Sequence, residues 1–239
     1  MNINVIINPC GLEDLYFTNK TVVVIDVLRA TNTIINALEN GAKEVIPVAA
    51  VEFAVKVSGG MFGGQTLLGG ERNTKKIEGF ALGNSPLEYS DDVVDGKTIV
   101  FYTTNGTPAI VKAKFSEFLT VCSFANVSAV AKDLIKRKND FEILCASRNN
   151  SLSIEDLVCA GNLIEEISKN RKNIALTDSA NASVTLFKAM GKDIKKMLSE
   201  TDHGKLLINN GFEEDIAFCS QINSSKAVPV FLNNSLKLS

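Results

Sequence analysis

The chain has 239 residues, a formal net charge of −2, and 45% hydrophobic and 22% charged residues, an ordinary composition for a globular protein. This slightly acidic balance excludes the basic footprint of a nucleic-acid-binding protein. No apolar run approaches the roughly 20 residues of a membrane-spanning helix, and the first ten residues lack the basic region of a signal peptide. We therefore expect neither a nucleic acid nor a membrane as a partner.

The first 146 residues alternate between apolar runs and segments of helical period. The predicted strands are Ile3–Asn8, Thr21–Asp26, Glu44–Val48, Thr66–Gly69, Thr98–Thr103, Phe118–Cys122 and Phe141–Ala146. The predicted helices between them are Thr33–Asn40, Val51–Ser58, Ala109–Phe115 and Val127–Lys138. Continuous apolar strands that alternate with helices indicate a sheet covered on both faces. We predict a three-layer α/β/α fold with a largely parallel or mixed sheet.

After Ala146 the pattern becomes mostly helical. Helices are predicted at Ser153–Lys169, Asp178–Met190, Asp193–Leu198, Asp202–Asn210 and Phe212–Ile222, and a strand at Val228–Leu232 is expected to close the chain. The segment Glu71–Lys97 has little regular pattern, and such long loops are usually functional or mobile. The length allows one α/β domain over residues 1–239, or two closely packed lobes.

The cysteine and histidine counts narrow the chemistry. Five cysteines, an odd number without a C-x-x-C motif, predict reduced thiols and a cytoplasmic protein. The single histidine, His203, excludes zinc sites built on histidine pairs and phosphatases with two active histidines. We assign His203 to the start of a helix rather than to the substrate. Catalysis then depends mainly on carboxylates, arginines, hydroxyl groups and backbone N–H groups.

Polar and charged side chains follow the predicted strands, where parallel sheets bind their ligands. The candidates are Asp26 and Arg29, Glu71 and Arg72, Thr103 to Thr107, Ser123 and Asn126, and Ser147 and Arg148 followed by Glu155 and Asp156. A carboxylate directly after a buried strand marks the point where that strand reaches a site. The structural alternatives are a cap at Asp26 paired with Arg29, and a surface salt bridge at Glu71 and Arg72.

The stretch "TTNGTPA" has a mechanism for binding an anion. Gly106 permits a left-handed turn, Thr107 suits an N-cap, and Pro108 suits the first helical position. Backbone N–H groups at such a helix start face an incoming anion. A well-capped helix without a ligand is the alternative.

The adjacent acids in "LSIEDLVCAG" lie in the first turn of a predicted helix. Glu155 and Asp156 could serve only as partners of the helix dipole. Joined in space by Asp26 or Glu71, they would form a set of oxygen ligands that suits Mg²⁺. The sequence leaves both interpretations open.

Together these segments resemble the magnesium-dependent 2-phosphosulfolactate phosphatases of the coenzyme M pathway. The matching stretches are "DVLRATNTI", "GGERNTKKIEGFALGNSPLEY", "TTNGTPA", "LSIEDLVCAG" and, more weakly, "DHGKLLINNGFEEDIAFC" with "VPVF". They follow the family's order over most of residues 20–231. The resemblance implies hydrolysis of a phosphate monoester on a three-carbon acid that carries a sulfonate, and a homodimer.

Residue by residue, the resemblance implies metal and catalytic carboxylates at Asp26, Glu71, Glu155 and Asp156. It implies anion contacts at Arg29, Arg72 and the Thr103–Thr107 turn. We predict that Asp26, Glu71 and Arg29 are catalytic and that Asp26, Glu155 and Asp156 bind the metal. We also predict a set of substrate contacts. That set is Arg72, Thr103, Thr104, Asn105, Gly106, Thr107 and Asn126.

The sequence departs from the family pattern at five positions. Thr is usual at Asn32, Gly at Asn73, Asp at Ala81, and Gly at Ser147 and Asn150. Arg148 lies outside the matching positions, so the resemblance assigns it no role. These changes leave open a different substrate with the same phosphoryl chemistry.

We therefore predict hydrolysis of 2-phospho-3-sulfolactate to 3-sulfolactate and phosphate with Mg²⁺. Asp26 would attack phosphorus, or water bound to the metal would attack with Asp26 or Glu71 as base or ligand. The alternatives are a phosphatase for another phosphorylated hydroxy acid and a non-catalytic binder of an anionic metabolite.

Overall fold

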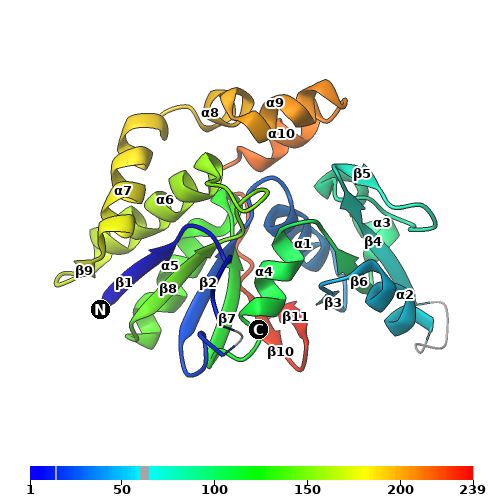
Figure 1. Cartoon of the computed structure of the whole chain (residues 1–239), viewed down its shortest axis with the longest axis horizontal. Coiled ribbons are helices and arrows are strands. Elements are labelled where there is room, and N and C mark those ends of the chain that lie inside the picture. The colour runs from blue at the N-terminus through cyan, green and yellow to red at the C-terminus, as the bar shows by residue number, and fades with distance from the viewer. Residues whose placement is uncertain (14, 60–64, 239) are drawn as a thin grey trace.

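The predicted alternation of strands and helices is present in the computed structural model, which describes residues 1–13, 15–59 and 65–238 (Figure 1). The strands are β1 Asn2–Ile6, β2 Thr21–Ile25, β3 Glu44–Pro47, β4 Thr66–Arg72, β5 Lys75–Lys76, β6 Thr98–Tyr102, β7 Phe118–Cys122, β8 Phe141–Cys145, β9 Ala175–Leu176, β10 Pro229–Leu232 and β11 Ser235–Leu238. The predicted α/β class is confirmed.

Helices cover the sheet. They are α1 Ala30–Glu39, α2 Val51–Gly59, α3 Asp91–Val94, α4 Gly106–Lys112, α5 Val127–Arg137, α6 Ile154–Asn170, α7 Asp178–Met190, α8 Ile194–Glu200, α9 Asp202–Asn209 and α10 Glu213–Cys219. Two short 3₁₀ helices, η1 Pro86–Glu88 and η2 Phe124–Asn126, complete the described elements. No helix among the described residues has the length and apolar character needed to cross a membrane.

The described strands form one sheet in the order β5-β4-β6-β3-β11-β10-β7-β2-β8-β1-β9. Strands β4, β6 and β3 pair in parallel, and so do β7, β2, β8, β1 and β9. Between these two parallel parts lies the antiparallel hairpin of β10 and β11. The sequence predicted one closing strand, whereas the structure has this two-stranded hairpin.

The two faces of the sheet are buried against different helices because side chains alternate along each strand. On β2, Val23 and Ile25 join a cluster with residues of α5 and α6, while Val22 and Val24 join a cluster with residues of α1 and α4. A smaller cluster joins α2 to β6. This double coverage explains why β2 is buried throughout and apolar from Val22 to Ile25.

The segment Glu71–Lys97 is less irregular than predicted. It contains β5, η1 and α3, and the side chain of Tyr89 within it is buried. The Tyr89 hydroxyl donates to the Gly83 carbonyl at 2.7 Å, and Asn36 of α1 donates to the Pro86 carbonyl at 2.9 Å. These bonds fix the segment against α1, beside the edge where the strands end.

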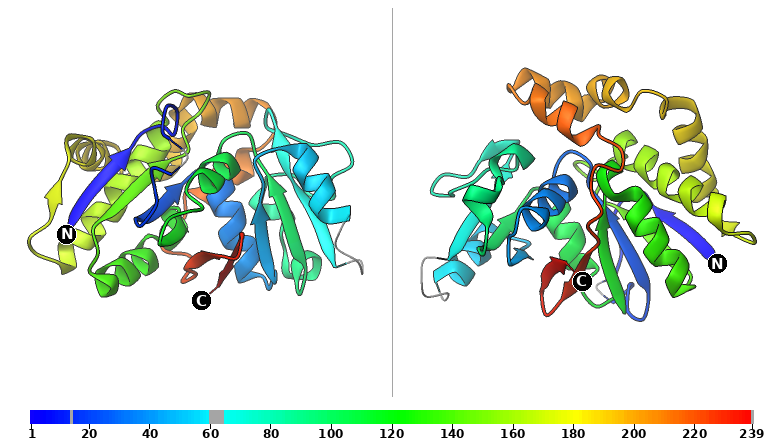
Figure 2. Two further views of the ribbon diagram at one scale, coloured as in Figure 1. Left: turned by 60° about the horizontal axis from the view of Figure 1, so that its bottom comes forward. Right: turned by 180° about the vertical axis from the view of Figure 1, so that it is seen from behind.

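Helices α8, α9 and α10 lie over the carboxyl ends of the central strands, on the side opposite the C-terminal hairpin (Figures 1 and 2). Figure 2 shows this placement from two further sides. The C-terminal third of the chain therefore returns to the edge at which the sequence predicts the site.

Candidate active site

A cavity of about 210 Å³ lies at the carboxyl edge of the sheet. It lies between loops after β2, β4, β6 and β8 and the start of α9. Its lining comprises Asp26, Leu28, Arg29, Glu71, Asn73, Thr74, Asn84, Thr104, Asn105, Arg148, Asn149, His203 and Leu206. β2 and β4 belong to the two different parallel parts of the sheet, so the cavity forms where those parts face one another.

Asp26 follows β2 directly, and its side chain is buried, with 8% of the residue exposed. Its Oδ1 accepts the backbone N–H of Ala30 at 3.3 Å, in the first turn of α1. Its Oδ2 accepts no hydrogen bond from the described residues. Asp26 thus lines the cavity with one carboxylate oxygen that no described residue engages, while the other oxygen caps the turn.

Gly106 lies against that oxygen, but not as the sequence predicted. The left-handed turn expected at Gly106 is wrong, since its φ is not positive, and the N-cap of α4 is Asn105 rather than Thr107. A Cβ at Gly106 would lie 2.4 Å from the Cβ of Ala30 and 2.5 Å from Asp26 Oδ2. Close packing of α4 on α1 and Asp26, rather than a turn, is what requires glycine here.

Glu71 joins two loops of the cavity. Its Oε2 accepts the N–H of Thr74, and its Oε1 accepts the N–H of Thr104, each at 2.7 Å. Glu71 is 7% exposed, so these bonds hold the loops after β4 and β6 in a fixed relation. Arg72, the next residue, is exposed, has its guanidinium 6.0 Å from the Tyr102 ring centroid, and does not line the cavity.

Arg29 is buried and ion-paired, but with Asp215 of α10 instead of Asp26. A second guanidinium nitrogen donates to the Thr74 carbonyl at 3.3 Å, and the guanidinium carbon lies 4.2 Å from the Phe212 ring centroid. Ser85 donates to the other Asp215 oxygen at 2.6 Å. Arg29 therefore lines the cavity with its charge already balanced by a buried carboxylate.

Glu155 and Asp156 occupy the first turn of α6, as predicted. Asp156 Oδ1 accepts the N–H of Val27 at 2.9 Å, which holds the strand end beside Asp26. Glu155 Oε1 lies 3.4 Å from His203 Nδ1 and lines an adjoining cavity of about 310 Å³. Both acids are buried, and Asp156 lines neither cavity.

The crowding of carboxylates changes their acidity. Burial raises the pKa of Asp26 to about 6; His203 opposes this rise, and Glu71 and Glu155 add to it. Burial also raises the pKa of Asp156 well above its usual range, with the charges of Asp26 and Glu155 contributing. These acids lie close enough to repel one another, and a cation among them would relieve that repulsion.

The residues of the Thr103–Thr107 turn have two different roles. The Thr107 hydroxyl accepts the N–H of Thr103 at 2.9 Å, and the Thr103 hydroxyl accepts the N–H of Thr107 at 3.0 Å. These two residues are buried and close the turn. Thr104 and Asn105 line the cavity, which keeps them available for a ligand.

Asn126 was predicted to bind substrate, but its side chain is fully engaged in the fold. Its oxygen accepts the N–H of Ser123 at 2.9 Å, and its amide group donates to the carbonyls of Val121 and Ala227 at 3.2 and 3.0 Å. It is completely buried and lies outside the cavity lining. Asn126 therefore joins β7 to the segment that leads into β10.

Several residues that line the cavity were given no part in the predicted site. His203 starts α9, as expected, yet it also lines both cavities, and Arg148 and Asn84 were given no role. The Oδ1 of Asn84 and the Oγ1 of Thr104 are buried without a hydrogen-bond partner. Their only signal in the sequence was their position after strands or within the long segment.

Three departures from the family pattern have one backbone explanation. Asn73, Ser147 and Asn150, which replace the usual Gly, have φ values of 53°, 63° and 57°. These left-handed conformations favour glycine and tolerate asparagine. Asn32 is buried, donating to the Val27 carbonyl at 2.8 Å and accepting from Ser123 at 2.8 Å, whereas Ala81 is exposed.

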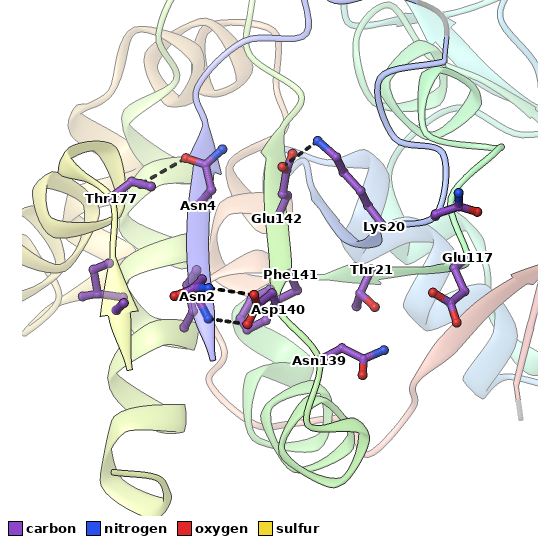
Figure 3. A pocket seen from close by; sticks show the side chains of 14 residues that line it. Asn2, Asn4, Lys20, Thr21, Glu117, Asn139, Asp140, Phe141, Glu142 and Thr177 are labelled. Atoms are coloured by element: carbon purple, nitrogen blue, oxygen red, sulfur yellow. Dashed lines mark hydrogen bonds and ion pairs between the residues drawn. The ribbon is translucent and has the colours of Figure 1, made fainter. Parts of the chain in front are cut away.

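A larger cavity, of about 780 Å³, lies at the opposite, amino edge of the sheet (Figure 3). Its charged groups are largely paired within the protein, as in the 2.9 Å contact of Lys20 with Glu142 and the two 2.7 Å bonds from Asn2 to Asp140. We place the active site in the smaller cavity because the unengaged carboxylate oxygen and the strand ends are there.

No group of three or more His, Cys, Asp or Glu side chains within the described residues has the geometry of a metal site. Mg²⁺, however, is usually held by one or two carboxylates together with water and substrate phosphate, so a complete protein cage is not required. The site therefore supplies carboxylate oxygens without a preformed cage.

The polar cavity with buried carboxylates lies at the carboxyl edge of an α/β sheet, where proteins of this fold class bind their ligands. The model of the 2-phosphosulpholactate phosphatase family matches residues 9–234, and the chain belongs to that family. This match confirms the family predicted from the motifs, and with it the enzyme class, the phosphoric monoester hydrolases.

Relatives of the chain carry the same description. A probable 2-phosphosulfolactate phosphatase of Thermotoga maritima is 41% identical over 97% of this chain and 96% of its own length. Those of Clostridium acetobutylicum and Caldanaerobacter subterraneus are 38% and 41% identical, over 99% and 96% of this chain and 100% and 95% of their own lengths. The similarity thus extends over nearly the whole of each protein.

Proposed function

We propose that this protein hydrolyses 2-phospho-3-sulfolactate to 3-sulfolactate and phosphate, with Mg²⁺ as cofactor. Family membership and the names of the relatives support the substrate. The observation that carries the proposal for this chain is Asp26 Oδ2. It is an oxygen of a buried carboxylate that accepts no hydrogen bond from the described residues, and it belongs to a residue that lines the cavity at the strand ends.

The residues fit a magnesium ion on the chemistry of their donors. Asp26 and Glu155 are the carboxylates that would hold it, and Asp156 would position Asp26 through the N–H of Val27. The buried, unpartnered oxygens of Asn84 and Thr104 match the hydrogen-bonding groups of hydrated Mg²⁺ and of phosphate. When bound, the ion would supply positive charge to the phosphoryl group.

The other residues position the reaction. Glu71 holds the loops that carry Thr74 and Thr104, and the Thr104 hydroxyl is free to donate to a phosphate oxygen. The reaction breaks the bond between phosphorus and the ester oxygen and adds the oxygen of water to phosphorus. The leaving alkoxide receives a proton and becomes the hydroxyl group of the product. Asp26 either attacks phosphorus itself or deprotonates the water.

The stereochemical course at phosphorus distinguishes the two routes. With a substrate whose phosphorus is made chiral by isotopes, retention of configuration indicates two displacements through a phosphorylated Asp26, and inversion indicates a single attack by water. Label from H₂¹⁸O enters phosphate in both routes, and it enters the Asp26 carboxylate only if water opens the phosphoryl ester at the acyl carbon. Trapping of phosphorylated Asp26 would independently establish the first route.

The first test is phosphate release from 2-phospho-3-sulfolactate with Mg²⁺ and with EDTA, compared with phosphoglycerate, phospholactate and p-nitrophenyl phosphate. We expect release that needs Mg²⁺ and is greatest with the sulfonate substrate. We expect Asp26→Asn to lower kcat by about 10²–10⁴-fold, the range for a lost acid–base group. A kcat of this variant close to that of the wild type would contradict the catalytic role of Asp26.

Metal binding has its own readout. Mg²⁺ at 100 times its dissociation constant should stabilise the wild-type protein by about 2.7 kcal/mol, measured as a rise in unfolding temperature, and Asp26→Asn should abolish that rise. An equal rise in both proteins would place the metal elsewhere. Phosphate release from a different substrate would support the phosphatase reaction but assign the protein to another pathway. Binding of a substrate without phosphate release would favour a non-catalytic binder.

We further propose a cytoplasmic location and a homodimer. The described cysteines are all free thiols, four of them buried, which supports a reducing compartment. Sedimentation equilibrium of the purified protein tests the dimer, for which the resemblance to the family is the only support.

A further inference from the structure

The proposed substrate carries a phosphate and two further oxyanions, so the site needs fixed positive charge beyond a metal ion. The basic side chains that line the two adjoining cavities are Arg29, Arg148 and His203. Arg29 is ion-paired with the buried Asp215, and His203 lies 3.4 Å from Glu155. Within the described residues, Arg148 has no ion-pair partner. Arg148 therefore remains to receive an anion.

Arg148 lies where a second anionic group would be placed. Together with Asn149 and His203 it lines both the cavity that contains Asp26 and the adjoining cavity. A substrate whose phosphate lies near Asp26 would direct its other substituents along this shared wall. The rest of the adjoining cavity includes the acidic residues Glu155, Glu200 and Asp202, which would repel an anion. An anionic group of the substrate would therefore bind beside Arg148.

The backbone holds Arg148 in a defined position. Arg148 and Ser151 pair across a two-residue turn, the N–H of Arg148 donating at 3.2 Å and that of Ser151 at 2.8 Å. The turn residues Asn149 and Asn150 have φ values of 51° and 57°, as a type I′ turn requires. Asn8 donates to the Asn150 carbonyl and ties the turn to the segment after β1. The arginine is thus presented by a small, closed hairpin.

We propose that Arg148 determines specificity by binding a non-phosphate oxyanion of the substrate, the carboxylate or the sulfonate. The inference rests on the proposed function, because it assigns a contact within that site. Guanidinium groups bind planar or tetrahedral oxyanions through two parallel N–H donors, which gives both charge and orientation. The phosphoryl chemistry stays with the carboxylates around Asp26.

The test measures kcat/KM for wild type, Arg148→Ala and Arg148→Lys on three substrates. These are 2-phospho-3-sulfolactate, phospholactate without the sulfonate, and p-nitrophenyl phosphate with neither oxyanion. We expect Arg148→Ala to lower kcat/KM for the first by about 10- to 100-fold, mainly through KM. Activity on p-nitrophenyl phosphate should stay within about twofold, and lysine should restore part of the loss.

The measurements on phospholactate show which oxyanion of the substrate Arg148 binds. A loss equal to that on the full substrate assigns Arg148 to the carboxylate, and no loss assigns it to the sulfonate. Equal losses on all three substrates, or no loss on any, would overturn the proposal. Arg171→Ala, at the other end of α6 and outside both cavities, is the matched control and should behave as wild type.

A second readout separates this proposal from the proposed function. If the wild-type protein releases phosphate from none of the substrates, the proposed function fails, and calorimetric binding of 3-sulfolactate then tests Arg148 alone. We expect Arg148→Ala to weaken that binding by at least about tenfold. Unchanged binding, or no binding to the wild type, would overturn the assignment.

Discussion

Asp26 is buried among other acids, yet one of its oxygens accepts no hydrogen bond from the described residues. Such a carboxylate destabilises the folded protein whenever it is ionised without a cation, because burial and the nearby Glu71 and Glu155 both disfavour its charge. Binding sites commonly keep groups of this kind, since a ligand supplies the missing partner. The stability of the metal-free protein should therefore report on Asp26.

The prediction concerns the pH dependence of that stability. The pKa of Asp26 is raised from 3.8 to about 6 in the folded protein, so the folded state binds the proton more tightly than the unfolded state. The stability of the metal-free wild type relative to Asp26→Asn should be highest below about pH 4 and fall as pH rises to about 6. Above pH 6 the variant should be more stable by about 1–3 kcal/mol.

Urea unfolding in EDTA at pH 4, 5, 6 and 7.5 measures this difference. Asp133→Asn, at a surface ion pair with Arg137, is the control, and its effect should stay within about 0.5 kcal/mol. A difference between wild type and Asp26→Asn that is constant over this range would contradict the raised pKa.

At the level of elements, the contact between α1 and α4 fixes the floor of the site. Gly106 permits it, since a Cβ there would approach Ala30 and Asp26 to within 2.5 Å, where atoms do not come closer than 3.0 Å. We expect Gly106→Ala to push α4 away from α1. The free energy of unfolding should fall by about 1–3 kcal/mol, as in other overpacked cores, and phosphate release should fall with it.

Gly59→Ala is the matched control, because nothing lies within 4 Å of a Cβ built at Gly59. Urea unfolding and phosphate release of both variants provide the comparison. Wild-type behaviour of Gly106→Ala in both measurements would show that α4 does not pack against Asp26 as described.

At the level of the whole molecule, the pair of Arg29 and Asp215 connects the end of β2 to α10, across 186 residues of sequence. Each side chain is only 2% exposed. Asp215 also accepts from Ser85, so it joins the long segment after β4 to the C-terminal helices. One buried carboxylate thus holds three distant parts of the chain around the cavity.

Removing that carboxylate leaves the Arg29 charge buried and unpaired. We expect Asp215→Ala to lower the free energy of unfolding by about 3–5 kcal/mol, measured in urea. The double variant Arg29→Met with Asp215→Leu should recover much of this stability, because no isolated charge remains. A loss below about 1 kcal/mol in Asp215→Ala would indicate that the pair is accessible to water.

Much of the fold was predictable because its signals are local. The apolar strands and the helical periods reflect burial on both faces of the sheet, and β7 and α7 have the predicted bounds. The placement of Asp26 and Glu71 at strand ends followed from the parallel arrangement. The hairpin of β10 and β11 did not, since its pairing with β3 and β7 is set by contacts across the chain.

The sequence by itself determined the class of fold, the family and the identity of the strand-end carboxylates, because these depend on periodicity and on ordered motifs. Only the tertiary structure decided which charges remain unpaired. It paired Arg29 with Asp215, engaged Asn126 within the fold, and placed Arg148 at the wall of two cavities. Charge pairing depends on distances between residues far apart in sequence, and those distances exist only once the chain has folded.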